Sequence, residues 1–113
     1  MNLSHIIDGH PDDAPALISR GRVTTYGALR QQVGSMRGAL TRNGVGKGDV
    51  VALLCGNSRY FVVSYLAAIG VGAIVSPLNP TSPAPEIEGE LHVVKPTVVV
   101  VEPSAVATWL QIP

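Results

Sequence analysis

The sequence predicts an α/β fold in which helices are layered on a small parallel sheet. Residues 50–54 and the apolar run after Gly72 form two uncharged segments, and the apolar residues 60–69 lie between them. Continuous apolar runs without alternation are typical of strands that are covered on both faces. Two such strands joined by a helix require a crossover connection, so residues 49–80 predict a βαβ unit. We expect the rest of the chain to be organised around this unit.

A membrane span is the main alternative for this region, because residues 61–78 carry no charge. That stretch is at the short limit for crossing a bilayer, which takes about 20 residues. Glycines interrupt it, Pro77 ends it, and the adjoining uncharged strand would need a sheet partner that lipid cannot supply. The sequence therefore favours a βαβ unit over a membrane span.

The bulk composition excludes several classes of protein. A chain of 113 residues forms at most one small domain, and its net charge of zero gives no electrostatic footprint for nucleic acid. An apolar fraction of 46% with only 14% charged residues excludes compositional disorder and indicates strong dependence on burial, including burial against surface outside the chain. Cys55 is the single cysteine, which excludes an internal disulfide. The first residues lack the features of a signal peptide, so we expect a cytoplasmic protein.

The first part of the chain predicts a lead-in, a hairpin and a helix. Residues 1–15 are turn-rich, and the β-like pieces 16–19 and 23–24 flank a tight turn at 20–22. Thr25 is suited to cap a helix that ends at Asn43-Gly44, since both of these residues tolerate the left-handed conformation. The apolar residues on one face of this helix are Leu29, Val33, Met36 and Leu40, and we expect them in the core.

The glycine-rich segment 44–49 invites comparison with a phosphate-binding loop, but its surroundings exclude that function. A Walker loop needs Ser or Thr after its lysine, and here Gly48 follows Lys47. A dinucleotide fingerprint follows a strand and opens a helix, whereas this segment leaves a helix and enters a strand. We interpret it as a connector.

The turn 56–58 is the strongest candidate for a binding site, because it follows a strand and opens a helix. Ligands of open α/β sheets gather at that edge, and helix N-termini favour anions. The simpler interpretation, which we favour, is that Asn57 or Ser58 caps the helix. Cys55 beside the turn is expected to be a small buried apolar residue, because no neighbouring His or Lys would activate its thiol.

The C-terminal part completes a βαβαβα order over residues 49–113. Prolines exclude helix from Pro77 until about Pro85, and residues 86–94 then predict a helix with Ile87, Leu91 and Val94 on one side. Residues 98–101 are four valines, which predict a third buried strand, and residues 103–110 predict a short helix. The histidines share no ligand spacing, so no metal site is expected at His5, His10 or His92.

Taken in order, several segments resemble the N-terminal region of the AMP-forming adenylating enzymes. They are Thr-Thr-Tyr-Gly-Ala-Leu at 24–29, the helix after it, the segment 44–52, the Asn57-Ser58 pair and Pro-Leu-Asn-Pro at 77–80. That superfamily contains acyl-CoA synthetases, fatty acyl-AMP ligases, adenylation domains of peptide synthetases and luciferases. The resemblance covers about residues 16–101, and the Pro-Leu-Asn-Pro form is most similar to fatty-acyl and aryl ligases.

The chain departs from the family pattern at two places. Ala28 stands where an acidic residue usually completes a capping box with Thr25, which should weaken that helix start. Cys55-Gly56 stands where many relatives have a proline before the Asn-Ser pair.

The resemblance implies that residues 1–113 are the N-terminal portion of an AMP-binding, acyl-activating domain, an incomplete subdomain. Such enzymes use ATP and Mg²⁺ to convert a carboxylate into an acyl-adenylate and pyrophosphate, and many pass the acyl group to CoA. Their phosphate loop, nucleotide contacts and catalytic lysine have no matching positions here, so no catalytic, cofactor-binding or metal-binding residue is expected in this chain. We expect a non-catalytic part of a fatty-acid–CoA ligase or fatty acyl-AMP ligase, with the remainder of that enzyme as its partner.

Two other functions remain open from the sequence. A stand-alone α/β interaction module would pair through an exposed sheet edge or apolar face, and on this view we expect a dimer or larger assembly. A small flavodoxin-like nucleotide-binding protein would need the turn 56–58 to hold phosphate.

Overall fold

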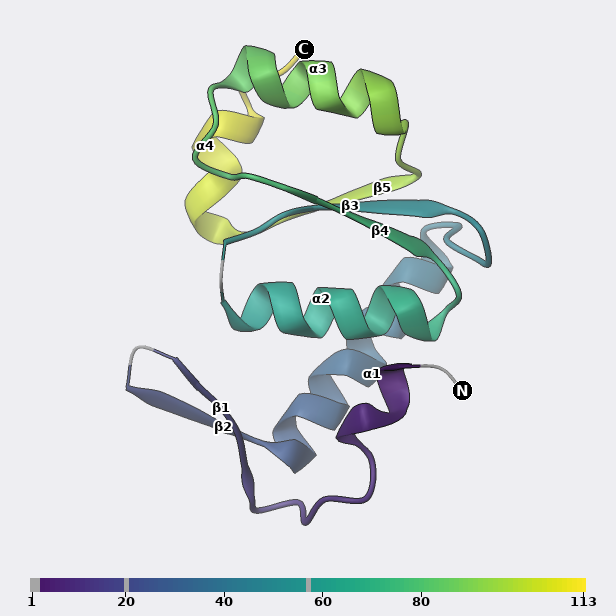
Figure 1. Ribbon diagram of the computed structural model, residues 1–113, viewed down its shortest axis with the longest axis vertical. Coiled ribbons are helices and arrows are strands. Elements are labelled where there is room, and N and C mark those ends of the chain that lie inside the picture. The colour runs from purple at the N-terminus through teal and green to yellow at the C-terminus, as the bar shows by residue number, and fades with distance from the viewer. Residues whose placement is uncertain (1–2, 20, 57) are drawn as a thin grey trace.

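The computed structural model describes residues 3–19, 21–56 and 58–113. In chain order its elements are η1 (Leu3–Ile7), β1 (Pro15–Ser19), β2 (Arg22–Thr25), α1 (Tyr26–Arg42), β3 (Val50–Leu54), α2 (Arg59–Gly70), β4 (Ile74–Leu78), α3 (Ala84–Val94), β5 (Val98–Val101), η2 (Pro103–Ala105) and α4 (Val106–Trp109). The predicted α/β class is confirmed. Figure 1 shows a small sheet with helices on both of its faces.

The sheet has the strand order β4-β3-β5, and both neighbours of β3 are parallel to it. Helix α2 joins β3 to β4, so the predicted βαβ unit is confirmed. Helix α3 then joins β4 to β5 across the far side of β3. At the middle of the sheet Ala52 is paired with Ser76 of β4 and with Val99 of β5.

The core lies on both faces of β3, whose side chains alternate between two clusters. Val51 and Leu53 belong to the cluster that contains the buried residues of α1 and α2. Ala52 and Leu54 pack with Leu78 and with residues from α3 to α4. All four side chains are fully buried, because helices cover both faces of the sheet at this strand (Figure 1).

The two flanking strands are less buried than the sequence predicts. All four valines of β5 are only half-buried, and Ile74 of β4 is 57% exposed. Both strands lie at edges of a three-stranded sheet, so one side of each has no neighbouring strand within the described residues. The expectation that all three strands are buried is therefore wrong for β4 and β5, because an apolar run does not specify whether a strand is central.

Helix α1 begins where the sequence predicts. The Oγ1 of Thr25 accepts a hydrogen bond from the Ala28 N–H at 3.2 Å, which confirms Thr25 as the N-cap. Three residues of the predicted apolar face are buried, and Met36 is half-buried against the same cluster. At the other end Asn43 has a φ of −95°, and Gly44 alone takes the left-handed conformation, with a φ of 85°.

Strands β1 and β2 form the predicted antiparallel hairpin, which projects from the start of α1 (Figure 1). Part of its predicted turn, Arg20, lies outside the described residues. The lead-in is more structured than expected, because residues 3–7 form the 3₁₀ helix η1, which contacts α2. Ile7 is buried, and its carbonyl accepts a 2.8 Å hydrogen bond from Nη1 of Arg30 on α1. This anchor joins residues far apart in sequence, and therefore no local pattern could predict it.

The C-terminal helices follow the prediction with shifted limits. Helix α3 starts at Ala84 with Pro85 in its first turn, buries Ile87 and ends before Lys95, which is left-handed with a φ of 49°. The predicted helix at 103–110 begins as the 3₁₀ turn η2 and continues as α4. In the described part of the chain, no helix has both the length and the apolar character to cross a membrane. The predicted alternative span is broken where α2 ends at Gly70.

Candidate functional site

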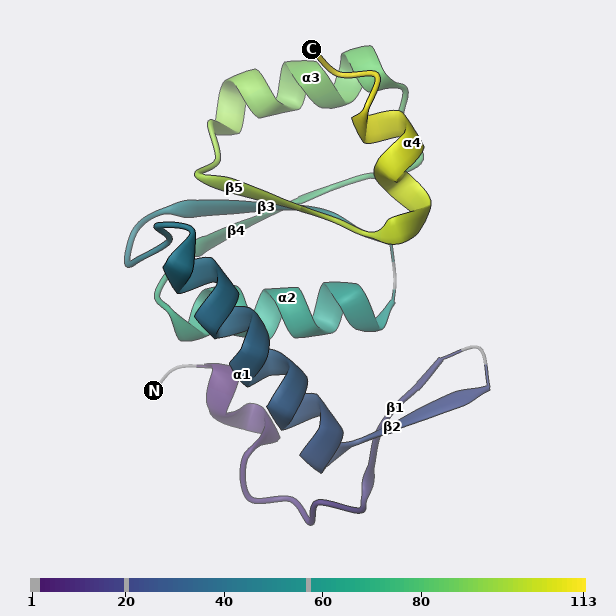
Figure 2. The same ribbon diagram turned by 180° about the vertical axis from the view of Figure 1, so that it is seen from behind.

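The carboxyl ends of the parallel strands form the candidate site. From β3 the chain enters α2 on one face of the sheet, and from β5 it enters η2 and α4 on the other (Figures 1 and 2). Adjacent strands whose connections diverge in this way make a topological switch point, where open α/β sheets bind ligands. The ends of β3 and β5 therefore define the position at which chemistry would be expected.

Glu102 connects these two strand ends. Its N–H donates to the carbonyl of Leu54 at 3.2 Å, which extends the β3–β5 pairing by one residue. Its carboxylate accepts two side-chain hydrogen bonds, from Ser58 Oγ to Oε2 at 3.3 Å and from Ser104 Oγ to Oε1 at 3.0 Å. A Cβ at Gly56 would lie 3.3 Å from Glu102 Oε1, so a glycine fits this close approach best. Glu102 thus holds the turn after β3 against the turn after β5.

Cys55 lies beside this network and is inert at neutral pH. The side chain is 5% exposed, and its Sγ lies 3.7 Å from the carbonyl oxygen of Val100. Burial, and secondarily the Glu102 carboxylate, raise the pKa of the Cys55 thiol to about 11. A thiol that stays protonated at pH 7 is a poor nucleophile, so the expectation of a buried, unactivated cysteine is confirmed.

The predicted cap of α2, Asn57 or Ser58, can be tested only at Ser58. Ser58 occupies the N-cap position of α2, but its side chain makes no capping hydrogen bond and binds Glu102 instead. Asn57, the other predicted cap, lies outside the described residues. The Glu102 carboxylate beside the turn opposes a bound anion electrostatically, so the described residues do not fit a phosphate group there.

An open pocket of about 370 Å³ lies between the ends of β3 and β4. Cys55, Gly56 and Phe61 form one side of its lining, and residues 77–80 form the other. Asn79 is the polar side chain of the lining, and its Oδ1 already accepts hydrogen bonds from Thr81 N at 2.9 Å and Thr81 Oγ1 at 2.7 Å. The pocket therefore suits an apolar group and supplies no acid or base.

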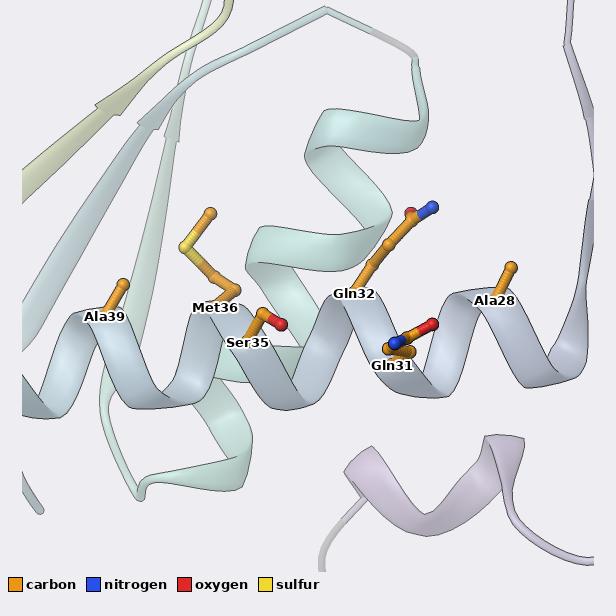
Figure 3. Close-up of a pocket in the computed structure, with 6 residues that line it drawn as sticks. All are labelled: Ala28, Gln31, Gln32, Ser35, Met36 and Ala39. Atoms are coloured by element: carbon orange, nitrogen blue, oxygen red, sulfur yellow. The ribbon is translucent and has the colours of Figure 1, made fainter.

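Two further hollows involve α1. One of about 480 Å³ lies along its outer side, and Figure 3 shows the residues that line it: Ala28, Gln31, Gln32, Ser35, Met36 and Ala39. The other, of about 330 Å³, lies among η1, the hairpin, α1 and α2. His10 stacks on Tyr26 at its wall, with ring centroids 4.2 Å apart. Neither lining combines a nucleophile with a base.

Each histidine has a different partner. His5 pairs with Asp8 at 3.0 Å, His10 stacks on an aromatic ring, and His92 approaches Glu88 at 3.8 Å on an exposed helix face. Across the described ranges, no group of three or more His, Cys, Asp or Glu side chains is arranged to hold a metal ion.

Glu102 is the residue of this site that sequence reasoning missed. A usable signal exists, since Glu102 directly follows a predicted strand and precedes a proline and a serine. Its partner Ser58 follows another strand. What the sequence lacks is the strand order that brings these two ends together.

Comparison with known proteins identifies the family. The family model described as AMP-binding enzyme matches residues 3–112. The chain is 40% identical to 4-coumarate–CoA ligase 1 of Oryza sativa subsp. japonica over 95 residues, which are 80% of this chain and 17% of that ligase. It is 36% identical to 3-hydroxybenzoate–CoA ligase of Aromatoleum sp. (strain CIB) over 84 residues, 70% of this chain and 16% of that one.

A solved structure agrees with these matches. Apo MatB from Rhodopseudomonas palustris superposes with a TM-score of 0.78 at 26% identity, over 97% of this chain and 22% of MatB, and ATP-bound MatB gives the same values. The chain thus spans 16–17% of the length of the two CoA ligases named above. This chain belongs to the AMP-binding enzyme family, and it matches an N-terminal part of these adenylate-forming enzymes.

Proposed function

We propose that this chain is the N-terminal scaffold of an ATP-dependent carboxylate–CoA ligase that works through an acyl-adenylate. The observation that carries the proposal is a family match across residues 3–112 of a chain that spans only 16–22% of the relatives named above. Two of those relatives are named as CoA ligases. The scaffold would fix the first strands of the sheet, and catalytic groups would come from elsewhere in such an enzyme.

We further propose a lipophilic acid, such as a fatty acid or an aromatic acid, as the substrate. The apolar pocket between the ends of β3 and β4 supports this, because residues from both strand ends present mainly carbon surface there. The pocket contains the Pro-Leu-Asn-Pro segment 77–80, whose form resembles that of fatty-acyl and aryl ligases. On this view the strand ends line the acyl side of the cleft.

ATP, Mg²⁺ and CoA would be bound by residues outside this chain. The Glu102 carboxylate lies beside the turn after β3, where a phosphate would need hydrogen-bond donors. The described residues offer no cluster of side chains that could hold a metal ion. We also propose a cytoplasmic location, since the single cysteine is a free, buried thiol. Recovery of a tagged chain in a membrane or secreted fraction would contradict that location.

Isotope exchange of pyrophosphate into ATP tests the function. The purified chain should show no exchange with Mg²⁺ and a panel of fatty and aromatic acids, because on this proposal the nucleotide-binding groups lie elsewhere in the enzyme. A longer protein that carries this chain as its N-terminal part should exchange pyrophosphate with at least one acid of the panel. Turnover by the chain alone would overturn the scaffold role, and a longer protein that is silent with every acid would overturn the proposed activity.

Calorimetric titration addresses the remaining alternative. A flavodoxin-like protein would bind ATP, AMP or FMN, whereas we expect no heat of binding from this chain with any of them. The expectation rests on the carboxylate of Glu102, which lies beside the turn between β3 and α2 and binds Ser58 there.

A further inference from the structure

We propose that Phe61 determines substrate specificity by limiting the length of the acid that the enzyme accepts. Phe61 lies in the first turn of α2 and lines two hollows. One is the pocket of about 370 Å³ between the ends of β3 and β4, called here the strand-end pocket. The other is the hollow of about 330 Å³ among η1, the hairpin, α1 and α2, called here the hairpin hollow. The inference rests on the proposed function, because it assigns the strand-end pocket to the tail of a lipophilic acid.

The fold places the two hollows on either side of the start of α2. Helix α2 lies between the sheet and the layer that contains α1 and the hairpin, and the hairpin projects on the side where β3 ends (Figures 1 and 2). Among the described residues, Phe61 is the one that belongs to both linings. Its side chain is therefore the partition between a pocket at the strand ends and a second apolar space behind it.

The ring of Phe61 is held in place from within the protein. The side chain is half-buried and packs against the core cluster that contains the buried residues of α1 and α2. Its ring also stacks on Tyr65, one helical turn later, with ring centroids 5.9 Å apart and an interplanar angle of 14°. Tyr65 lines the hairpin hollow and not the strand-end pocket. A ring supported in this way forms a fixed wall, which is what a limit on substrate length requires.

The hairpin hollow has the chemistry to receive more of an apolar tail. No Asp, Glu, Lys or Arg is found among the described residues that line it. His10 and Tyr26 stack on one another at its wall. Most of the remaining lining is aliphatic, from the side chains of Ile7, Leu17, Leu29, Val62 and Leu66. Further methylene groups that entered this space would leave water without displacing a charged group, which is favourable.

Glu102 determines which end of the acid enters the strand-end pocket. Gly56 lines this pocket, and a Cβ built on Gly56 would lie 3.3 Å from Oε1 of Glu102. A substrate carboxylate beside Gly56 would therefore face a like charge, which is unfavourable. The Oδ1 of Asn79, on the other side of the pocket, already accepts two hydrogen bonds from Thr81. The tail of the acid, rather than its carboxylate, is thus expected in the pocket, where its end meets Phe61.

The dependence of kcat/KM on acid length tests this role in a longer protein that carries this chain as its N-terminal part. The panel contains straight-chain fatty acids and benzoic acids with para-alkyl chains of increasing length. Phe61→Ala should join the two hollows, whereas Phe61→Trp should fill more of the strand-end pocket. For the acid that is two methylenes longer than the best one, kcat/KM relative to the best acid should rise about tenfold in Phe61→Ala, because each buried methylene contributes about fourfold. Phe61→Trp should shift the preference toward shorter acids.

Ratios measured within one sample do not depend on the fraction of protein that is folded, so a loss of stability alone would not move them. Tyr60→Ala is the matched control, because Tyr60 precedes Phe61 on α2, is 40% exposed and lines neither hollow. Its ratios should equal those of the unmodified protein. If Phe61→Ala fails to fold, the shift toward shorter acids in Phe61→Trp decides the question.

The outcomes separate this inference from the proposed function. An active longer protein whose ratios stay the same in both Phe61 variants would overturn the role of Phe61 and leave the proposed function standing. Equal shifts in Tyr60→Ala and Phe61→Ala would also overturn it, because the effect would not belong to the partition. A longer protein that is silent with every acid would overturn the proposed function and this inference together.

Discussion

Strands β3 and β5 are similar in sequence and opposite in environment. Val50–Leu54 and Val98–Val101 are both short, uncharged and apolar, and they pair in parallel with Leu53 opposite Val100. Leu53 is 0% exposed, whereas every valine of β5 remains half-buried. The difference comes from the number of neighbours, because within the described residues β3 has a strand on each side and β5 has one. An apolar run therefore specifies that a strand can be buried, and the strand order determines whether it is.

The two edge strands differ from one another in turn. The Ile74 N–H donates to the Asp49 carbonyl, so by regular alternation Pro77 of β4 faces outward, whereas β5 presents an unbroken row of valines. An edge strand that contains an outward-facing proline resists pairing with a further strand, whereas an edge strand without one can accept such a strand. The same kind of substitution should therefore lower the free energy of unfolding by different amounts in β3 and in β5.

Proline substitutions at paired positions of β3 and β5 should give the largest difference in the free energy of unfolding. Ala52 and Val99 are register partners. In β3 every N–H points toward one neighbouring strand or the other, so Ala52→Pro breaks a buried ladder hydrogen bond and should cost about 3 kcal/mol or more. The Glu102 N–H donates to Leu54, so regular alternation points the Val99 N–H away from β3. Val99→Pro therefore loses no bond to β3, and trimming its half-buried side chain should cost about 1 kcal/mol. Urea unfolding followed by circular dichroism measures both. Equal losses would contradict the assignment of Val99 as outward-facing.

Shortening the last side chain of each strand should give a smaller difference in the free energy of unfolding, and β3 should again lose more than β5. Leu54 is fully buried and Val101 is half-buried in the same core cluster. Leu54→Ala removes the buried carbons beyond Cβ and should lower the free energy of unfolding by about 2–5 kcal/mol. Val101→Ala removes less carbon from a site open on one side and should cost about 1 kcal/mol. Urea midpoints, with the slope held equal, compare the two. A Val101→Ala loss as large as that of Leu54→Ala would show that the edge is covered in solution.

Elements that are defined by local pattern could be predicted from the sequence. The Thr25 cap, the apolar face of α1, the βαβ unit and the hairpin all follow from spacings of a few residues, and the structure confirms them. Segment η1 could not be predicted, because its anchor is a hydrogen bond between Ile7 and Arg30, which are 23 positions apart. Edge exposure of β4 and β5 was missed for a similar reason, since strand order depends on long-range pairing.

The candidate site shows the same limit. Its strand-to-helix turn after β3 was located correctly, but the partner of the Ser58 hydroxyl was not predicted. A helix N-cap is the local choice, and Glu102, 44 positions away, is the one that the structure shows. Chemistry that depends on two strand ends meeting is visible only once the sheet order is known.

The thiol at the end of β3 offers the smallest and most specific test of contact between the two strand ends. The pKa of Cys55 is raised from 9.0 to about 11 by burial first and by Glu102 second. Because an unfolded chain releases the thiol proton at lower pH, Cys55 contributes stability that is complete below pH 9 and is lost as the pH rises through about 11. Cys55→Ala should flatten that part of the stability profile, which makes it the control for other groups that titrate there.

Glu102→Gln should lower the pKa of Cys55 only part of the way toward 9.0, because burial remains. Ultraviolet thiolate absorbance, with Cys55→Ala subtracted to remove the tyrosines, measures the shift. If Glu102→Gln leaves the pKa unchanged, the ends of β3 and β5 do not meet as described, and the comparison between the central strand and its neighbour loses its structural basis.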